Sequence, residues 1–369
     1  MRLVGSDPIS ALFALSRYVS LLRVMGAENL EKWEKYMPIR LTPGKIAGLN
    51  AVSDSRGVIA ALAMDQRGLL RNMLARELGG SEPPAEMVSE FKTLVAQTLT
   101  KEASSILLDI EYGLEATKHI HGKGLLLAYE HAGYSPDKPE RLPSLFEGWS
   151  ALRIKEAGAN AVKILVYYNP FEKDWVNDRK RAWVERIGAE CKAVDIPFFL
   201  EFLPYDVHGE GEKSIEYARR KPEIILKSME EFSRERYGAD VLKIEVPMQM
   251  AHVEGTRAYR GQKLHTRAEA MEFIRAEAAL TGKPIIFLSA GVSSQVFLET
   301  LELAVESGAQ FHGVLAGRAT WQDGVPVFVK GGASALEAWL NTTGLHNVKE
   351  INKVLESAYP WHEARSLQA

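Results

Sequence analysis

Short apolar runs alternate with longer amphipathic stretches along the chain between residues 57 and 316. An apolar run of about four to eight residues is typical of a buried strand, whereas an amphipathic stretch of about ten or more is typical of a helix. Eight runs predict strands, over residues 58–64, 105–108, 125–129, 161–168, 197–203, 241–247, 284–289 and 313–316. Six stretches predict helices, over residues 86–99, 145–157, 175–194, 222–237, 267–281 and 294–307.

The alternation of strands and helices predicts the fold class. Because helical stretches separate the strands, the strands are expected to lie parallel to one another. Eight strands within about 260 residues fit a closed (β/α)8 TIM barrel better than an open sheet. Residues 109–125 depart from the rhythm, since they have room for at most a very short helix.

The start of the chain predicts helices outside this pattern. Ile9, Leu12 and Leu21 belong to a set of apolar residues near helical spacing, and Pro43 follows the last of the predicted helices. We therefore predict an N-terminal helical extension over residues 1–45. Two interpretations stay open: a helix packed on the outside of the barrel, or a partner-binding helix through which the chain would form a homodimer.

Residues 46–369 are predicted to form the barrel together with C-terminal helices. The tail from Ala333 onwards is amphipathic, and Trp339 and Leu340 are expected to pack it against the barrel.

Composition favours a protein that acts on small molecules. The formal net charge is −3 and the sequence pI is about 6.4, whereas nucleic-acid or anionic-membrane binding usually needs a basic face or tail. Cys191 is the one cysteine, which excludes an intrachain disulfide and a zinc site made of several thiolates. Arg17 and Arg23 interrupt the apolar N-terminal region, and no stretch approaches the roughly 18 uncharged apolar residues of a membrane span. We expect a cytoplasmic enzyme with no nucleic-acid or membrane partner.

Polar and ionisable residues lie at or near the carboxyl ends of the predicted strands. In a barrel of this kind the active site occupies that end, and unpaired buried charges are rarely tolerated in a structural core. Any one of these residues alone could belong to a structural ion pair, but together they predict an active site. The residues are Asp65, Gln66, Arg67, Asp109, Glu130, Lys163, Glu201, Lys243, Glu245, Ser289 and Arg318.

The last two strand ends predict a phosphate site. Ser289 and Gly291 join the seventh strand to a helix that begins near Ser294, while Gly317 and Arg318 follow the eighth strand. Small residues let backbone N–H groups approach an anion, the helix N-terminus adds its dipole, and arginine supplies a charged fork. Barrels of this type frequently bind phosphate with these two loops.

Two lysines lie within predicted strands. Burial lowers the pKa of an amine, which lets a lysine condense with a carbonyl group. Lys243 has Glu245 two residues further on, pointing to the same side of its strand. Glu201 lies among aromatic residues, which should raise its pKa toward the range of a useful acid or base. One of Lys163 and Lys243 would stay charged while the other becomes neutral, and the physical argument leaves open which one.

A metal-dependent alternative would need clustered ligands. Of the nine histidines, only His119 and His121 are close in sequence, and they fall beside Lys118 and Lys123 in a loop that we expect to be solvated. We therefore predict no metal and no other cofactor.

Eight motifs occur in order along the chain: Asp65-Gln66-Arg67-Gly68, Leu107-Leu108-Asp109, Tyr129-Glu130, Ala161-Val162-Lys163, Phe199-Leu200-Glu201, Lys243-Ile244-Glu245, Ser289-Ala290-Gly291 and Gly317-Arg318-Ala319. This combination resembles the class I tagatose 1,6-bisphosphate aldolases. The resemblance implies a (β/α)8 barrel that cleaves a phosphorylated ketose to dihydroxyacetone phosphate and glyceraldehyde 3-phosphate without a metal, in lactose and galactose catabolism. It does not extend to the first 40 or so residues.

The resemblance also implies roles for individual residues. It implies Schiff-base formation by Lys243, acid–base catalysis by Glu201, further catalytic roles for Lys163 and Asp65, substrate contact by Gln66, and phosphate binding by Ser289, Gly291, Gly317 and Arg318. The ligands of a second phosphate stay open, with Arg67 and Lys101 as candidates.

The substrate is less firmly indicated than the chemistry. Aldolases for other phosphorylated ketoses, including sulfofructose phosphate, share these motifs, and fructose 1,6-bisphosphate differs from tagatose 1,6-bisphosphate only at the fourth carbon. Two further alternatives reuse the phosphate loops: a sugar-phosphate isomerase or epimerase, and a regulator that senses a sugar phosphate and binds its partner through the N-terminal helices.

Overall fold

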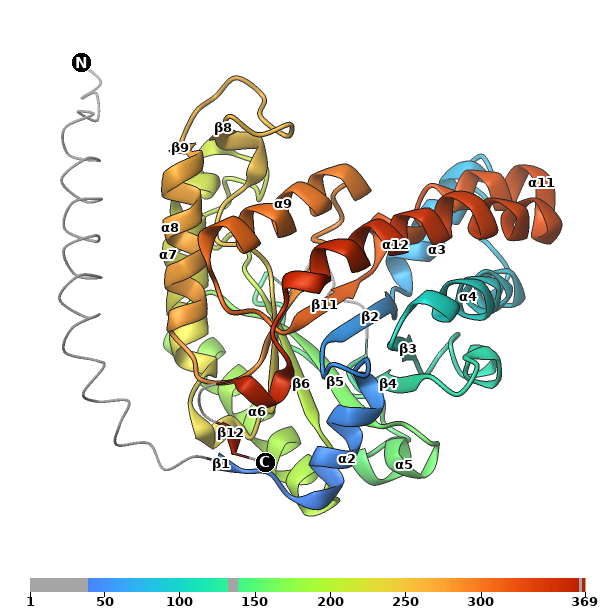
Figure 1. Cartoon of the computed structure of the whole chain (residues 1–369), viewed down its shortest axis with the longest axis horizontal. Helices are drawn as coiled ribbons and strands as arrows, with labels where there is room; N and C mark the ends of the chain where they lie inside the picture. The colour runs from blue at the N-terminus through green and yellow to red at the C-terminus, as the bar shows by residue number, and fades with distance from the viewer. Residues whose placement is uncertain (1–38, 132–138, 365–366, 369) are drawn as a thin grey trace, which may run out of the picture.

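The computed structural model describes residues 39–131, 139–364 and 367–368. Its centre is a closed barrel of eight parallel strands, in the order β10-β11-β2-β3-β4-β5-β6-β7, which confirms the predicted fold class (Figure 1). Each strand coincides with a predicted run, and the ends differ by at most three residues. The strands are β2 Ile59–Met64, β3 Ser105–Asp109, β4 Gly124–Ala128, β5 Ala161–Tyr167, β6 Phe198–Leu203, β7 Val241–Ile244, β10 Ile285–Leu288 and β11 Gly313–Ala316.

Helices surround the barrel (Figure 1). Those that follow the strands are α3 Gly68–Glu77, α4 Ala85–Leu99, α5 Ala151–Glu156, α6 Asp174–Ala193, α7 Ile215–Phe232, α8 Arg267–Ala279, α9 Ser294–Ser307 and α10 Arg318–Trp321. The region after β3 holds only the short 3-10 helix η2 Glu115–His119, as expected. The local sequence determines where several of these helices begin. Thr266 and Glu269, for example, form a capping box at the start of α8.

Shorter elements complete the chain. They are η1 Thr100–Glu102, η3 Glu235–Tyr237, η4 Met250–His252, η6 Leu355–Ser357 and η7 Trp361–Glu363, and two parallel pairs, β1 Ile39–Arg40 with β12 Leu367–Gln368 and β8 Val253–Glu254 with β9 His265–Thr266.

The predicted start of α7 is wrong. The start predicted from the sequence is Pro222, a residue type that is often found in the first turn of a helix. In the structure α7 begins at Ile215, the Ser214 hydroxyl accepts a hydrogen bond from the Tyr217 N–H at 3.1 Å, and Pro222 is buried inside the helix. The apolar face of α7, which packs inward, therefore outweighs the helix-breaking effect of an internal proline.

Two other helices differ from the prediction. Helix α5 starts at Ala151 rather than residue 145, because Leu145 forms an antiparallel bridge with Glu130 and Ser150 caps the helix. Helix α3 was not predicted; it buries only Leu70 and Leu74, so its apolar face is too narrow to stand out in the sequence.

Helix α2 (Pro43–Val52) closes the amino-terminal end of the barrel. Its residues Leu49 and Val52 are fully buried against inward-facing barrel side chains such as Phe199. Lys45 Nζ donates to both carboxylate oxygens of Asp240 at 2.8 Å, which ties α2 to the start of β7. The helix spans residue 45, the predicted boundary of the N-terminal extension, whose residues 1–38 lie outside the described residues.

The C-terminal region runs along the outside of the barrel. Helix α11 (Gly324–Trp339), the π-helical turn η5 (Leu340–Gly344) and α12 (Leu345–Val354) pack against α3, α4 and α9 (Figure 1). Leu340 is fully buried and Trp339 is half-buried, so both contribute to this packing as predicted.

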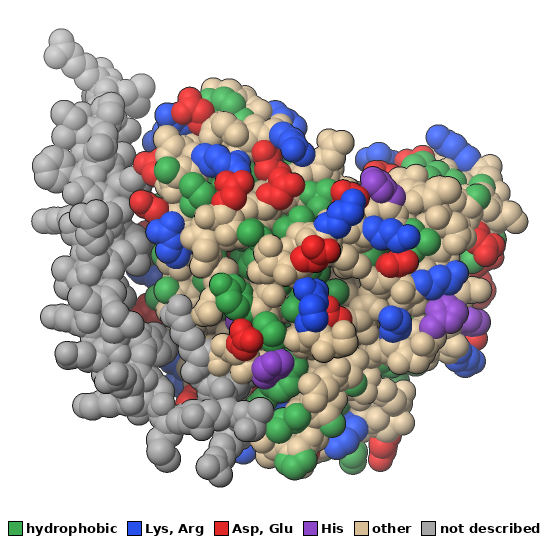
Figure 2. Space-filling model, viewed as in Figure 1, with side chains coloured by type: hydrophobic (Ala, Val, Ile, Leu, Met, Phe, Trp, Pro, Cys, Tyr) green, Lys and Arg blue, Asp and Glu red, His purple; other side chains and the backbone are tan. Residues whose placement is uncertain are grey.

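The described surface carries interspersed basic and acidic side chains in the view of Figure 2. Among the residues that the structure describes, no helix has both the length and the apolar character needed to cross a membrane.

Candidate active site

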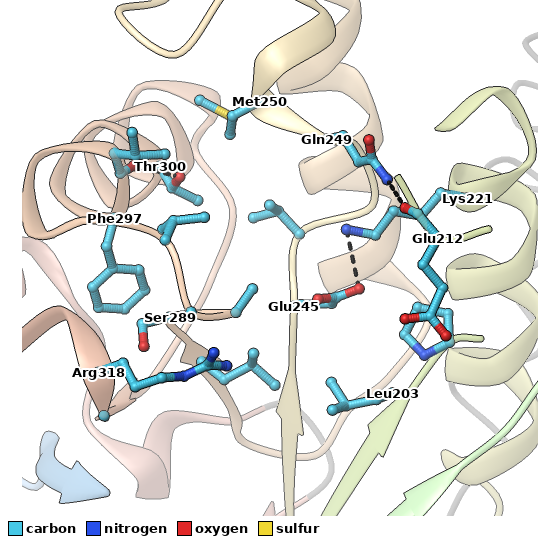
Figure 3. A pocket seen from close by; sticks show the side chains of 18 of the residues that line it. Leu203, Glu212, Lys221, Glu245, Gln249, Met250, Ser289, Phe297, Thr300 and Arg318 are labelled. Carbon is cyan, nitrogen blue, oxygen red and sulfur yellow. Dashed lines mark hydrogen bonds and ion pairs between the residues drawn. The ribbon is translucent and has the colours of Figure 1, made fainter. Parts of the chain in front are cut away.

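A cavity of about 660 Å³ opens at the carboxyl ends of the barrel strands (Figure 3). Its wall includes residues that lie far apart in the sequence but end neighbouring strands. Seven of the nine residues to which the resemblance gives a role line it: Gln66, Glu201, Lys243, Ser289, Gly291, Gly317 and Arg318. The other two, Asp65 and Lys163, join this set through Glu201.

Lys243 and Glu201 form a buried pair in the barrel. They are register partners on the adjacent strands β7 and β6, so the pleat directs both side chains inward. Lys243 Nζ donates a hydrogen bond to Glu201 Oε2 at 2.8 Å, and the two residues are 3% and 6% exposed. A lysine and a carboxyl group in direct contact and facing a cavity can exchange a proton with each other or with a bound molecule.

Lys163 lies against three carboxylates. Its Nζ is 2.7 Å from Asp65 Oδ2, 3.0 Å from Glu130 Oε1 and 2.9 Å from Glu201 Oε2. Burial lowers the pKa of Lys163, but Asp65, Glu130 and Glu201 more than offset this and hold it well above its ordinary value. Lys163 is therefore a permanent cation at neutral pH.

Asp65 is the matching permanent anion. Burial raises the pKa of its carboxyl group, but the ammonium groups of Lys163 and Lys243 and the guanidinium of Arg67 hold that pKa below its ordinary value. The cluster therefore combines two groups of fixed charge with the Lys243–Glu201 pair.

Glu245 does not pair with Lys243, although both line the cavity. Its carboxylate lies 3.0 Å from Lys221 Nζ of α7 (Figure 3). Strand β7 ends at Ile244, so the chain leaves the sheet before Glu245 and its side chain turns toward α7. The carboxylate partner of Lys243 is Glu201 from the neighbouring strand.

Three other polar residues singled out in the sequence have different positions from those expected. Asp109 is buried against Lys92 of α4, and its Oδ1 accepts from the N–H groups of Glu111 and Tyr112 at 2.9 and 2.8 Å. Arg67 contacts Glu130 rather than the cavity. Lys101, the other candidate for a second phosphate, lines a separate hollow beside Gly124, at the amino-terminal end of the barrel and away from this cavity.

The loop from Ser289 to Ser293 and the turn at Gly317 lie side by side. Gly291 has a φ of +73°, and a Cβ atom there would lie 2.2 Å from Arg318 Nη1. Glycine is thus required both for the backbone conformation and for the close approach of the guanidinium. Ser293 then caps α9, since its hydroxyl accepts from the Val296 N–H at 3.4 Å.

Arg318 is a half-buried cation on which the carboxylates of Glu201 and Asp65 act from beyond ion-pair distance. In the part of the chain that the structure describes, no carboxylate oxygen lies within ion-pair distance of its guanidinium. Burial lowers the pKa of Arg318, as expected for a cation withdrawn from water without full compensation. A guanidinium over a glycine-rich loop at the start of a helix is a suitable place for a phosphate group.

The far wall of the cavity was not anticipated from the sequence. It comprises Lys221 of α7 and the segment after β7, including Gln249, Met250 and Arg260 (Figure 3). Lys221 was missed because this helix is predicted from the sequence to start at residue 222, whereas α7 begins at Ile215 and includes Lys221. Lys221 is paired there with Glu245 at 3.0 Å, so this wall adds an ion pair opposite Arg318.

Within residues 39–131, 139–364 and 367–368, no group of three or more histidine, cysteine, aspartate and glutamate side chains is arranged to hold a metal ion.

Known proteins similar to this chain point to one family. Residues 59–323 match the DeoC/LacD family of aldolases. The tagatose 1,6-diphosphate aldolase of Lactococcus lactis subsp. lactis is 48% identical over 323 residues, which cover 87% of this chain and 98% of that protein. The enzyme of the same name from Streptococcus pneumoniae is 49% identical over 325 residues, covering 88% of this chain and 99% of that protein.

Solved structures share the fold at low sequence identity. The fructose-bisphosphate aldolase of Plasmodium falciparum superposes with a TM-score of 0.64 at 15% identity, covering 88% of this chain and 98% of that chain. An archaeal fructose 1,6-bisphosphate aldolase gives a TM-score of 0.50 at 16% identity, covering 81% and 98%. With most of its barrel matched and relatives close to half identical over nearly their full length, this chain belongs to the DeoC/LacD family of aldolases.

Proposed function

We propose that this protein is a class I aldolase that reversibly cleaves tagatose 1,6-bisphosphate to dihydroxyacetone phosphate and glyceraldehyde 3-phosphate. The observation that carries the proposal is the buried Lys243–Glu201 pair, in contact at 2.8 Å within the cavity that also holds the Arg318 loop. The names of the relatives at 48% and 49% identity support the substrate class.

Lys243 is the proposed nucleophile. Lys163 is held as a cation by three carboxylates, so its nitrogen lone pair is not available, whereas Lys243 contacts only the carboxylate of Glu201 among the described residues. Transfer of a proton from Lys243 Nζ to Glu201 leaves a neutral amine that adds to the ketone at the second carbon. Loss of water, with a proton supplied by Glu201, gives the protonated imine.

Cleavage then uses the imine as an electron sink. Glu201, again ionised, accepts the proton of the hydroxyl on the fourth carbon as the bond between the third and fourth carbons breaks. Glyceraldehyde 3-phosphate leaves and an enamine remains on Lys243; protonation at the third carbon and addition of water release dihydroxyacetone phosphate. Lys163 and Asp65 would bind the sugar hydroxyl groups, because both lie against Glu201 or its immediate partner.

Phosphate binding positions the ketone over Lys243. We assign the phosphate of the dihydroxyacetone half to Ser289, Gly291, Gly317 and Arg318, with Gln66 beside them, because its Nε2, a hydrogen-bond donor, lies close to Gly317 at the cavity wall. Holding the ketone near the amine replaces an encounter of two molecules by a reaction within one complex.

The decisive experiment is borohydride reduction of the protein with dihydroxyacetone phosphate in the presence of EDTA, followed by peptide mass spectrometry. The expected result is one stable adduct on Lys243, absent from Lys243→Met. Lys163→Met serves as the matched control and should still be trapped, at a reduced rate. An adduct on Lys163 would move the nucleophile, and no adduct with folded wild-type protein would refute the imine mechanism in favour of an isomerase or a sugar-phosphate sensor.

Substrate preference needs a separate comparison of tagatose and fructose 1,6-bisphosphates, which differ at the fourth carbon next to Glu201. A sulfofructose phosphate tests the remaining alternative.

We also infer a cytoplasmic location, which fits a phosphorylated sugar substrate and a single buried thiol. A homodimer stays a prediction that size-exclusion chromatography with light scattering can test.

A further inference from the structure

Glu130 is a buried carboxylate for which the proposed reaction has no role. It lies just beyond the end of β4 and is 2% exposed. Its backbone oxygen accepts from Arg67 Nη1 at 2.7 Å, and its Oε1 lies 3.0 Å from Lys163 Nζ and 3.5 Å from Arg67 Nη2. Its Oε2 is buried without a hydrogen-bond partner in the described part of the chain. Burying a carboxylate with one oxygen unsatisfied is costly, which suggests a purpose other than stability.

The hydrogen bonds of Lys163 show what Glu130 changes. An ammonium group has three N–H donors. Lys163 directs hydrogen bonds to Asp65 at 2.7 Å and to Glu130 at 3.0 Å, while its contact with Glu201 Oε2 at 2.9 Å is an ion pair. The same Glu201 oxygen accepts the hydrogen bond of Lys243 at 2.8 Å. Asp65 and Glu130 thus take two of the three donors of Lys163, which leaves at most one for Glu201.

The balance of charges in this cluster also points to a role for Glu130. The contacts join three cations, Arg67, Lys163 and Lys243, to three carboxylates, Asp65, Glu130 and Glu201. Burial raises the pKa of Glu130, while Lys163 and Arg67 favour its charged form, in which it enters this balance. When a proton moves from Lys243 to Glu201, one N–H bond breaks, one O–H bond forms, and both groups become neutral. The four remaining charges, Arg67 and Lys163 against Asp65 and Glu130, still balance. Without the Glu130 charge, the remainder is positive.

We propose that Glu130 is a positioning residue that engages Lys163 and balances its charge, so that Glu201 stays free to exchange a proton with Lys243 and with the substrate. The inference rests on the proposed aldolase function and deepens it. Glu130 itself touches no reacting atom and acts through Lys163. The ionisable groups that face it are Arg67 and Asp65 from the end of β2, Lys163 from β5, and beyond Lys163 the pair Glu201 and Lys243.

The test is Glu130→Gln, which keeps the side-chain size and removes the charge. Excess positive charge favours the deprotonated form of every group in the cluster, so the pKa values of both Glu201 and Lys243 fall. Both limbs of the pH profile of kcat should therefore move to lower pH, by about one pH unit. At neutral pH we expect kcat to fall about tenfold or more, with a much smaller change in KM.

Two further variants separate positioning from a purely structural role. Glu130→Asp retains the charge and should keep both pH limbs at their wild-type positions, even if the rate is lower. Glu231→Gln is a matched control, because Glu231 is also a buried carboxylate in contact with a basic side chain, but it lies in the last turn of α7 and contacts Arg234 at 3.1 Å instead of Lys163; its pH profile should equal that of the wild type.

The outcomes distinguish the inference from the function on which it rests. If Glu130→Gln lowers thermal stability while its pH limbs stay in place, Glu130 is structural and the inference is overturned. If the wild-type protein gives no borohydride adduct with dihydroxyacetone phosphate, the proposed function itself fails. The proposed function and the inference are both supported if the wild type gives the borohydride adduct and the limbs of the pH profile shift in Glu130→Gln but not in the other variants.

Discussion

Gly291 is required both for the backbone conformation of its loop and for the position of Arg318 in the proposed phosphate site. Its φ of +73° and the 2.2 Å approach of Arg318 to the Cβ position make any side chain unfavourable there. Replacement by alanine should cost about 1–3 kcal/mol locally, and relief of that strain would displace the Arg318 guanidinium. We expect Gly291→Ala to raise KM for the sugar bisphosphate about 5- to 100-fold, measured by steady-state kinetics.

Gly308 provides the matched control for this prediction. It has nearly the same backbone conformation, with a φ of +72°, but no atom lies within 4 Å of the Cβ position and it ends α9 away from the cavity. Gly308→Ala should lower stability by about 1 kcal/mol and leave KM unchanged. Equal KM values for Gly291→Ala and wild type would argue against phosphate binding by this loop.

Residue-level prediction worked where chemistry follows from position on a strand. Lys163, Glu201 and Lys243 were recognised as barrel residues because alternation fixes which side chains face inward. The pairing of Lys243 with Glu201 instead of Glu245 depends on strand register, which a single sequence does not encode. The contacts of Glu130 depend likewise on the spatial neighbourhood of β2, β4 and β5.

At the scale of elements, strands were easier to predict than helices. Barrel strands are buried on both faces, so each is a continuous apolar run with sharp ends. Helices α3 and α5 are short and half-exposed, and their sequences carry too few apolar positions to define them. For α7, burial of the face around Pro222 overrode the local preference of proline for a helix start.

Helix α2 offers a test of how one element holds the barrel together. Lys45 and Asp240 form a buried ion pair at 2.8 Å, with 9% and 6% of their side chains exposed. Removing the lysine leaves the buried Asp240 carboxylate without its ion-pair partner and with the Phe198 N–H as a remaining donor at 2.8 Å, and breaking a buried pair in this way costs about 3–5 kcal/mol. We expect Lys45→Met to lower the free energy of unfolding by this amount in urea denaturation, with kcat of the folded enzyme unchanged because α2 lies at the opposite end from the cavity.

The double variant Lys45→Met/Asp240→Asn is the control. It removes the isolated charge as well, so it should recover part of the lost stability. The pair would contribute no coupling between α2 and β7 if the losses of stability in the single variants Lys45→Met and Asp240→Asn add up to the loss in the double variant.

For the whole molecule, closure of the barrel depends on His312, which connects three strands. Its N–H donates to Ile285 O at 2.8 Å, its carbonyl accepts from Ile59 N–H at 2.9 Å, and its Nδ1 accepts from Ile285 N–H at 3.1 Å. The ring is 3% exposed, and its burial lowers the pKa of His312 to about 4, compared with an ordinary value of 6.5.

This lowered pKa predicts how global stability depends on pH. Above pH 6.5 the imidazole is neutral in both folded and unfolded chains, so it contributes no pH dependence. Between 6.5 and about 4 the unfolded chain binds a proton that the folded chain does not. As the pH is lowered through this window, the free energy of unfolding should therefore fall by about 1.4 kcal/mol per pH unit because of this one group.

His312→Asn isolates that contribution, because an asparagine carbonyl can still accept from the Ile285 N–H but cannot titrate. The variant should be less stable than wild type at pH 7, while the difference between the two should shrink as the pH falls toward 4, measured by urea unfolding at closely spaced pH values. Replacement of the exposed His346 by asparagine is the control and should keep the wild-type slope. Parallel curves for wild type and His312→Asn would mean that the ring binds a proton as readily in the folded barrel as in the unfolded chain, which is incompatible with its burial and its acceptor role toward Ile285.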